Sequence, residues 1–117
     1  HDEESISYDT KITRGLDLMT GYSKCTKLGE GKIYVGGTTI ARHEVDSIQI
    51  VVIVERAKEE DTEWSYYDDW RKENLNMNRV TSNRTLYVEG DYYYRVRCIH
   101  VANSDMSSSF TDGIYIE

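Results

Sequence analysis

The segment from Leu86 to Cys98 restricts the fold more than any other part of this chain. A leucine stands six residues ahead of Tyr92, a turn at Gly90 separates the two, and a strictly alternating run follows. This arrangement is the pattern of a tyrosine corner in a β-sandwich. We expect the Tyr92 hydroxyl to bond back to the backbone before the corner. The inward positions of the run are Tyr94, Val96 and Cys98, and the outward positions are Tyr93, Arg95 and Arg97.

The composition supports the same fold class. The aliphatic residues are mostly β-branched, ten of the 117 residues are tyrosine, and proline is absent, so sheet is favoured over helix. A chain of this length suffices for one domain with a core of its own. We therefore predict an all-β fold, a seven-stranded antiparallel β-sandwich.

The hydrophobic alternation places the strands. Residues 1–15 are polar and aperiodic and are expected to form a flexible tail, with residues 16–117 forming the domain. A glycine-rich turn at 29–31 predicts a hairpin between the first two strands, and residues 46–56 have the pattern of a central strand. The predicted strands are 18–28, 32–41, 46–56, 64–71, 79–88, 91–102 and 109–117, the last with Phe110, Ile114 and Ile116 as candidate core residues.

Residues 64–71 admit two interpretations. Trp64, Tyr66 and Trp70 recur at period two, as in a strand. The same stretch places Trp64, Tyr67 and Arg71 along one face of a helix. We prefer the strand because the rest of the chain has sheet patterns.

Two cysteines, Cys25 and Cys98, are too far apart in sequence for a zinc knuckle or a redox C-x-x-C pair. Both fall in alternating segments, so a disulfide across the sheets is expected, with two buried free thiols as the alternative. A disulfide would indicate an oxidising compartment and an exported protein. The chain begins without methionine or a signal peptide, which fits a mature segment.

Charge and motifs exclude several functions. The net charge of −7 disfavours nucleic acid and anionic lipid as partners, and no apolar run is long enough to insert into a membrane. Three acidic groups, Glu59 to Asp61, Asp68 with Asp69, and Asp112, lack the spacing of a calcium loop. We expect no metal and no cofactor.

Catalytic motifs are absent as well. The sequence has no nucleophile elbow, phosphate loop or H-E-x-x-H motif. Its three histidines, His1, His43 and His100, stand at the terminus, in a predicted turn and at the end of a strand. We therefore expect that the protein is not an enzyme.

Aromatic and arginine side chains mark a candidate binding face. These residue types together are typical of binding hot spots in protein interfaces. The alternative is an ordinary solvated face on which arginines stack over tyrosines. The candidate binding residues are Trp64, Tyr67, Trp70, Tyr93, Arg95 and Arg97.

Leu86, Gly90, Tyr92, Tyr94, Val96 and Cys98 carry a resemblance to the fibronectin type III and immunoglobulin-like superfamily. About thirty residues match, including 100–104 as the loop before the last strand. The third strand lacks tryptophan, and Cys98 lies six residues after Tyr92, where the immunoglobulin pattern has two. The resemblance implies a fold, and the fold alone implies no function.

The whole chain also resembles a family of small secreted domains of unknown function from gut Firmicutes. The matching segments are residues 29–32, 37–39, 45–48, 64–70 and 90–96. This resemblance implies an exported bacterial protein, secreted or at the cell surface. We predict a non-catalytic binding or adhesion module for a protein or glycan; a structural or accessory domain without a dedicated ligand is the alternative.

Overall fold

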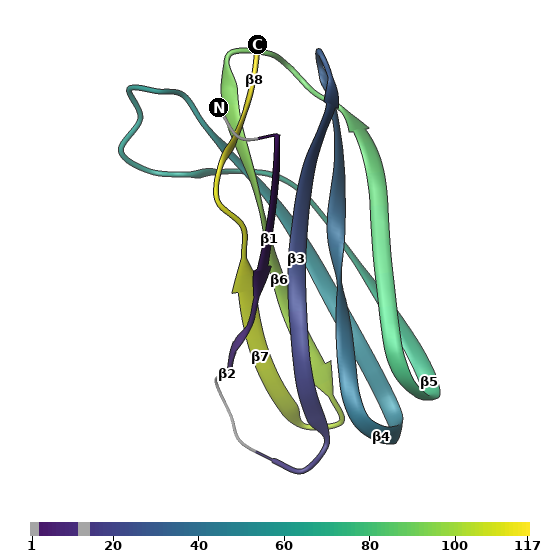
Figure 1. Cartoon of the computed structure of the whole chain (residues 1–117). Helices are drawn as coiled ribbons and strands as arrows, with labels where there is room; N and C mark the ends of the chain where they lie inside the picture. The colour runs from purple at the N-terminus through teal and green to yellow at the C-terminus, as the bar shows by residue number, and fades with distance from the viewer. Residues whose placement is uncertain (1–2, 12–14) are drawn as a thin grey trace.

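The computed structural model describes residues 3–11 and 15–117, and it confirms an all-β fold of antiparallel strands. The described residues form a sheet of eight strands (Figure 1). These are β1 (Glu4–Tyr8), β2 (Thr10–Lys11), β3 (Leu18–Gly29), β4 (Lys32–Ala57), β5 (Ser65–Tyr87), β6 (Tyr92–Ala102), β7 (Asp105–Phe110) and β8 (Ile114–Ile116).

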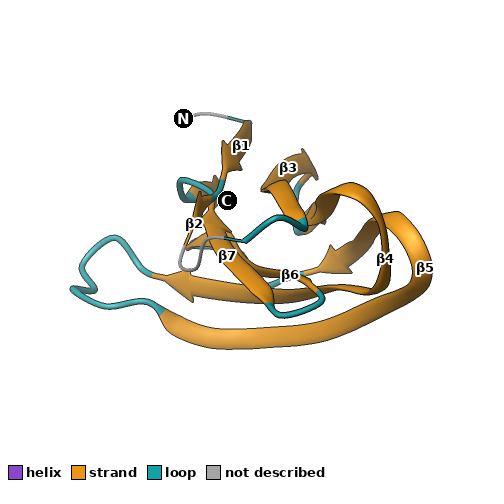
Figure 2. Ribbon diagram, turned by 90° about the horizontal axis from the view of Figure 1, so that it is seen from below, coloured by secondary structure: helices purple, strands orange, loops and turns teal. Residues whose placement is uncertain are grey.

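The sheet folds over on itself because its two longest strands are bent. The strand order is β1-β3-β4-β6-β7-β2, with β5 paired to β4 and β8 paired to β6. The β4–β5 register shifts between Ile40 and Val45, and Asn76 has a left-handed φ of 56° opposite this shift. Figure 2 shows both strands curving round one side of the molecule. A first layer therefore faces a second layer.

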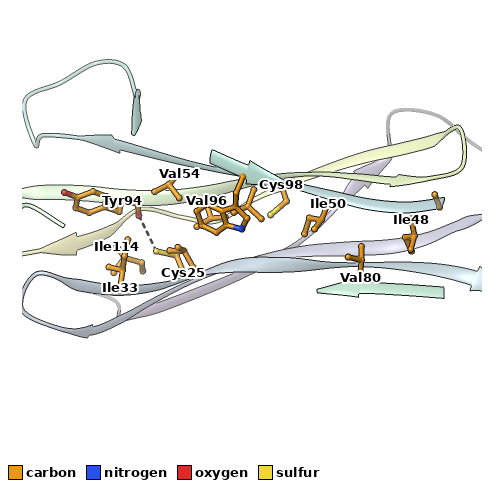
Figure 3. Packing of buried hydrophobic residues seen from close by; sticks show 14 of the residues in the cluster. Cys25, Ile33, Ile48, Ile50, Val54, Val80, Tyr94, Val96, Cys98 and Ile114 are labelled. Carbon is orange, nitrogen blue, oxygen red and sulfur yellow. Dashed lines mark hydrogen bonds between the residues drawn. The ribbon is translucent and has the colours of Figure 1, made fainter. Parts of the chain in front are cut away.

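The first layer contains β1, β3, residues 32–40 of β4 and residues 79–87 of β5. The second contains residues 45–57 of β4, residues 65–77 of β5, and β2, β6, β7 and β8. Branched aliphatic side chains from both layers meet between them (Figure 3). Among the core residues, Ile33, Val35, Ile50, Val52, Val54, Tyr94, Val96 and Ile114 are fully buried.

Three sequence predictions are confirmed. The first two predicted strands form a hairpin, whose turn at residues 29–31 contains Gly31 at a φ of 64°. The predicted central strand pairs with β5 on one side and β6 on the other. Residues from Ser65 onward form strand β5, which excludes the helical alternative.

The predicted breaks at 42–45 and 72–78 are wrong. Both stretches lie inside continuous strands, β4 and β5, at the positions where those strands bend. Arg42, His43 and Glu44 are exposed, so the apolar alternation stops there although the strand continues. Val45 still pairs with Met77 across the bend.

The predicted N-terminal tail is also wrong over residues 4–8. These form β1, in which Ser5 pairs with Cys25 and Tyr8 with Tyr22. Only Asp9 separates β1 from β2, which pairs with β7, so this segment connects the two ends of the sheet. The alternation was hidden because the half-buried positions of β1 are serines and the exposed positions include Ile6 and Tyr8. Residues 1–2 and 12–14 lie outside the described part.

The last predicted strand is two strands, β7 and β8, separated by residues 111–113. Ile114 and Ile116 are fully buried as expected, whereas Phe110 is 59% exposed. Phe110 pairs with Arg97, an outward residue of β6, and therefore shares its side of the sheet. Phe110 is not a core residue.

The tyrosine corner is present, but its residue is Tyr94 rather than Tyr92. The Tyr94 hydroxyl donates a hydrogen bond of 2.6 Å to the carbonyl oxygen of Glu89, before the corner. Tyr94 is fully buried, and Tyr92 is half-buried at the margin of the core. A buried phenol needs a partner for its hydroxyl, and this need is met at the inward position of the strand.

Replacing Tyr94 with phenylalanine is expected to lower the free energy of unfolding by about 1–2 kcal/mol, because the Glu89 carbonyl loses its donor. Tyr92→Phe is the matched control and should change it by about 0.5 kcal/mol or less. Urea unfolding followed by circular dichroism measures both. A greater loss for Tyr92→Phe than for Tyr94→Phe would restore the original assignment.

Candidate functional site

A charged network occupies the outward side of the second layer. Arg95 Nε donates to Glu55 Oε1 at 3.0 Å, and Arg97 Nε lies 3.8 Å from the same oxygen. Arg95 stands directly opposite Glu55 across the β4–β6 pairing. The Glu55 side chain is only 14% exposed, so the two arginines compensate a largely covered carboxylate.

Aromatic rings surround this network. The Arg95 guanidinium lies 4.5 Å from the Trp64 ring centroid and 5.8 Å from that of Phe110. Tyr93 and Tyr115 pack at 5.0 Å between ring centroids. Stacking of a guanidinium on aromatic rings fixes an otherwise flexible side chain. Trp64, Arg95 and Phe110 therefore form an ordered cluster.

A cavity of about 360 Å³ opens beside Trp64, between the loop at 58–64 and the start of β6. Trp64 and Tyr93 line its aromatic side, and Glu59, Asp61 and Glu63 line its acidic side. A hydrogen bond to Glu59 is the main cause that raises the pKa of Tyr93, and desolvation adds to it. The Tyr93 hydroxyl is the donor of this hydrogen bond, and the Glu59 carboxylate accepts it.

Half-buried aliphatic side chains continue the same surface along the sheet. Val51 pairs with Ile99, and Val101 pairs with the exposed Met106, all at outward positions. The residues that alternate with them along β4 and β6 are buried in the core. These aliphatic side chains therefore lie on the side of the sheet that faces away from the core. We call the combined surface the outer face: Trp64, Val51, Ile53, Glu55, Tyr93, Arg95, Arg97, Ile99, Val101, Met106 and Phe110.

The structure brings together four of the six predicted binding residues: Trp64, Tyr93, Arg95 and Arg97 lie on the outer face. The sequence prediction missed Glu55, and it assigned Phe110 to the core. Alternation along residues 50–56, with inward positions apolar, would have placed Glu55 outward. Its pairing with the arginines required the β4–β6 register.

Trp70 and Tyr67 do not belong to this site. Trp70 is 8% exposed, its Nε1 donates to Ser82 Oγ at 3.0 Å, and the Arg84 guanidinium lies 4.5 Å from its ring centroid. Tyr67 packs edge-on against Tyr94 at 5.6 Å. The prediction failed because the register shifts where Val54 pairs with Asp68 but Glu55 with Tyr66. This bulge breaks the period-two pattern between Trp64 and Trp70.

The predicted disulfide is wrong, because Cys25 and Cys98 are free thiols. Cys25 Sγ donates to the Tyr94 carbonyl oxygen, the dashed line in Figure 3, and Cys98 Sγ donates to the Gly36 carbonyl oxygen. Cys98 also contacts Ser23, which lies roughly 7 Å along β3 from Cys25. The two thiols therefore contact different carbonyl oxygens, at different positions along the strands. Burial raises the pKa of each to about 12, so both stay protonated.

A polar chain crosses the core at His100, which is fully buried. Its Nδ1 lies 2.8 Å from Thr39 Oγ1, and its Nε2 lies 2.7 Å from Ser109 Oγ. Thr39 uses its one hydroxyl proton on the Gln49 carbonyl, so Nδ1 must be the imidazole donor to Thr39 and Nε2 the acceptor from Ser109. Ser109 in turn accepts from Ser23 at 2.6 Å.

This Ser–His pair has no access to a substrate. Ser109 is 2% exposed, and His100 lies directly beneath Gly21 of β3, where a Cβ atom would come within 2.3 Å of the imidazole. Only glycine permits this approach. Burial lowers the pKa of His100 to about 4, so the imidazole is neutral at pH 7. The chain of hydrogen bonds connects the two layers.

Within the described ranges, no group of three histidine, cysteine or acidic side chains converges as a metal site would require. The same residues contain no helix with the length and apolar character needed to cross a membrane.

Comparison with known proteins gives little support for a function. No protein-family model matches the chain, and no curated protein matches it. The solution structure of R. palustris CsgH is similar, with a TM-score of 0.46 and 15% identity, covering 92% of this chain and 91% of that chain. A likeness at this level carries no argument about function. The resemblances to fibronectin type III domains and to secreted Firmicutes domains stay predictions.

Proposed function

We propose that this chain is a non-catalytic binding domain of an exported bacterial protein, with an immunoglobulin-like or fibronectin type III-like arrangement of strands, and that its outer face contacts a protein partner. Export rests on the resemblance to secreted domains alone, since the thiols are free. An accessory domain without a ligand is the alternative.

One observation carries the proposal: the aromatic and arginine cluster is continuous with an aliphatic strip. Arg97 stands opposite Phe110 in β7 and opposite Ile53 in β4. Two residues further along the β4–β6 ladder, Val51 stands opposite Ile99. Protein interfaces combine aromatic anchors and arginine with apolar area. The aliphatic strip supplies the apolar area that is typical of a protein interface, and this favours a protein over a glycan as the partner.

The arginines are already held in place. Glu55 and the Trp64 ring fix the Arg95 guanidinium, so binding loses less side-chain entropy than it would with free arginines. Trp64 also lines the 360 Å³ cavity, which can accept a protruding side chain of the partner. A preorganised anchor beside a pocket is the usual centre of a hot spot.

The test is selection of random peptides displayed on phage against the folded domain. We expect enriched peptides whose binding weakens at least about tenfold in Trp64→Ala, the cost typical of an anchor. Tyr87→Ala is the matched control, because Tyr87 is 78% exposed in the first layer. Its binding should equal that of the unaltered domain.

Two results would contradict the proposal. One is the absence of any enriched peptide, which would favour the accessory alternative. The other is a set of peptides that bind Trp64→Ala as well as the unaltered domain, which would move the binding surface elsewhere.

A further inference from the structure

The charges along the open edge of β5 complement those of the same edge in a second copy of the chain. Among the described residues, β5 pairs only with β4, so its other side carries backbone groups without strand partners. This edge is long, from Ser65 to Tyr87, but its two halves differ.

The second half is already covered by the first. Lys72 Nζ donates to the Thr81 carbonyl oxygen at 3.1 Å, and Asn74 Nδ2 donates to the Arg79 carbonyl oxygen at 2.9 Å. Both hydrogen bonds run from side chains of the first half to backbone carbonyls of the second half. The first half, around Trp70, is therefore the part available to another strand.

The order of charges in this half is antisymmetric about Trp70. Asp68 and Asp69 precede it, and Arg71 and Lys72 follow it. In an antiparallel pair of two β5 strands with its two-fold axis at Trp70, Asp69 stands opposite Arg71 of the other copy, and Asp68 stands opposite Lys72. Every such pair is attractive and occurs twice.

Other registers are less favourable. A two-fold axis at Arg71 places Asp69 opposite Glu73, and an axis at Lys72 places two lysines opposite each other. Like charges directly opposite destabilise a strand pair. Charged residues usually protect an open edge from association, but that protection fails when the pattern complements itself.

We infer that a second copy of this chain pairs with the first half of β5, antiparallel and centred on Trp70, and extends the second layer across a two-fold axis. Asp69 and Arg71 are exposed, and they line a depression of about 330 Å³ together with Val51 and Trp70. The Asp69 amide, now bonded to the Asp68 side chain, exchanges that partner for the carbonyl of Arg71 in the other copy. The contact borders the outer face at Val51, which stands opposite Arg71, and the polar core chain stays outside it.

Sedimentation velocity over a concentration series, up to millimolar protein, tests the inference. We expect reversible dimers of the unaltered chain. The Asp69–Arg71 pair occurs twice in the dimer, and Asp69→Arg or Arg71→Asp alone places like charges opposite each other at both places. Each variant should weaken dimerisation by about tenfold or more. The double variant restores opposite charges and should restore the dimer.

Arg79→Asp is the matched control, because it changes an exposed charge of β5 outside the pairing and should leave the dimer intact. Circular dichroism confirms that each variant is folded. A monomer at every concentration overturns the inference, and so does a dimer that either single charge reversal leaves unchanged.

Discussion

Replacing Trp70 with alanine is expected to lower the free energy of unfolding by about 3–5 kcal/mol, the usual cost of deleting a large core side chain. Trp70 is 8% exposed and belongs to the core cluster. It also spans the two halves of β5, because its indole donates to Ser82 and Arg84 stacks on its ring. The variant therefore leaves a cavity and removes a contact that holds the bent strand closed.

Trp64→Ala is the matched control in the same chain. Trp64 contacts Arg95 on the outer face, and its loss should cost about 1 kcal/mol or less. Urea unfolding of both variants, followed by circular dichroism, gives the comparison. Equal losses would contradict the placement of the two tryptophans on opposite sides of the sheet.

Acidification is expected to remove about 3 kcal/mol of stability through His100. The pKa of its imidazole is lowered by burial to about 4 in the folded state, against about 6.5 when unfolded. Between these values the unfolded chain binds the proton and the folded chain does not. The contribution is therefore fully present above pH 6.5 and is lost as the pH falls toward 4.

The structure explains why the folded protein resists this proton. Nε2 accepts from Ser109, so a second imidazole proton would require the Ser23–Ser109 hydrogen bond to reverse its direction at a fully buried position. The nearby Asp9 carboxylate favours protonation, but less strongly than burial opposes it.

His100→Gln separates this effect from the titration of carboxylates, which both proteins share. The unfolding free energy of the unaltered chain should fall more steeply between pH 6.5 and pH 4 than that of the variant. The difference between the two slopes integrates to about 3 kcal/mol. Parallel pH profiles would show that His100 is not buried in its neutral form.

The sequence predicted the all-β class because the decisive signal is local. Inward Tyr94, Val96 and Cys98 alternate with outward Tyr93, Arg95 and Arg97, and the structure confirms every one of these directions. The bends in β4 and β5 could not be predicted in this way. At Arg42 to Glu44 the apolar pattern stops, and only pairing with a distant partner shows that the strand continues.

Register also explains the errors at the candidate site. The bulge between Val54 and Glu55 turns Trp70 to the side opposite Trp64, although period-two alternation places both tryptophans on one side. Tyr67, an odd number of residues from Trp64, packs on the buried Tyr94. The disulfide prediction failed for a related reason. Both are buried as the alternation implied, but their positions along facing strands are offset, and alternation contains no information on that offset.

The measurement that tests the proposed outer face most directly is acrylamide quenching of two single-tryptophan variants. Trp70→Phe leaves Trp64 as the emitter, and Trp64→Phe leaves Trp70. We predict that acrylamide quenches Trp64 markedly more than Trp70, because Trp64 lines an open cavity and Trp70 is 8% exposed. Equal quenching, or stronger quenching of Trp70, would contradict the assignment of Trp64 to the binding surface and Trp70 to the core.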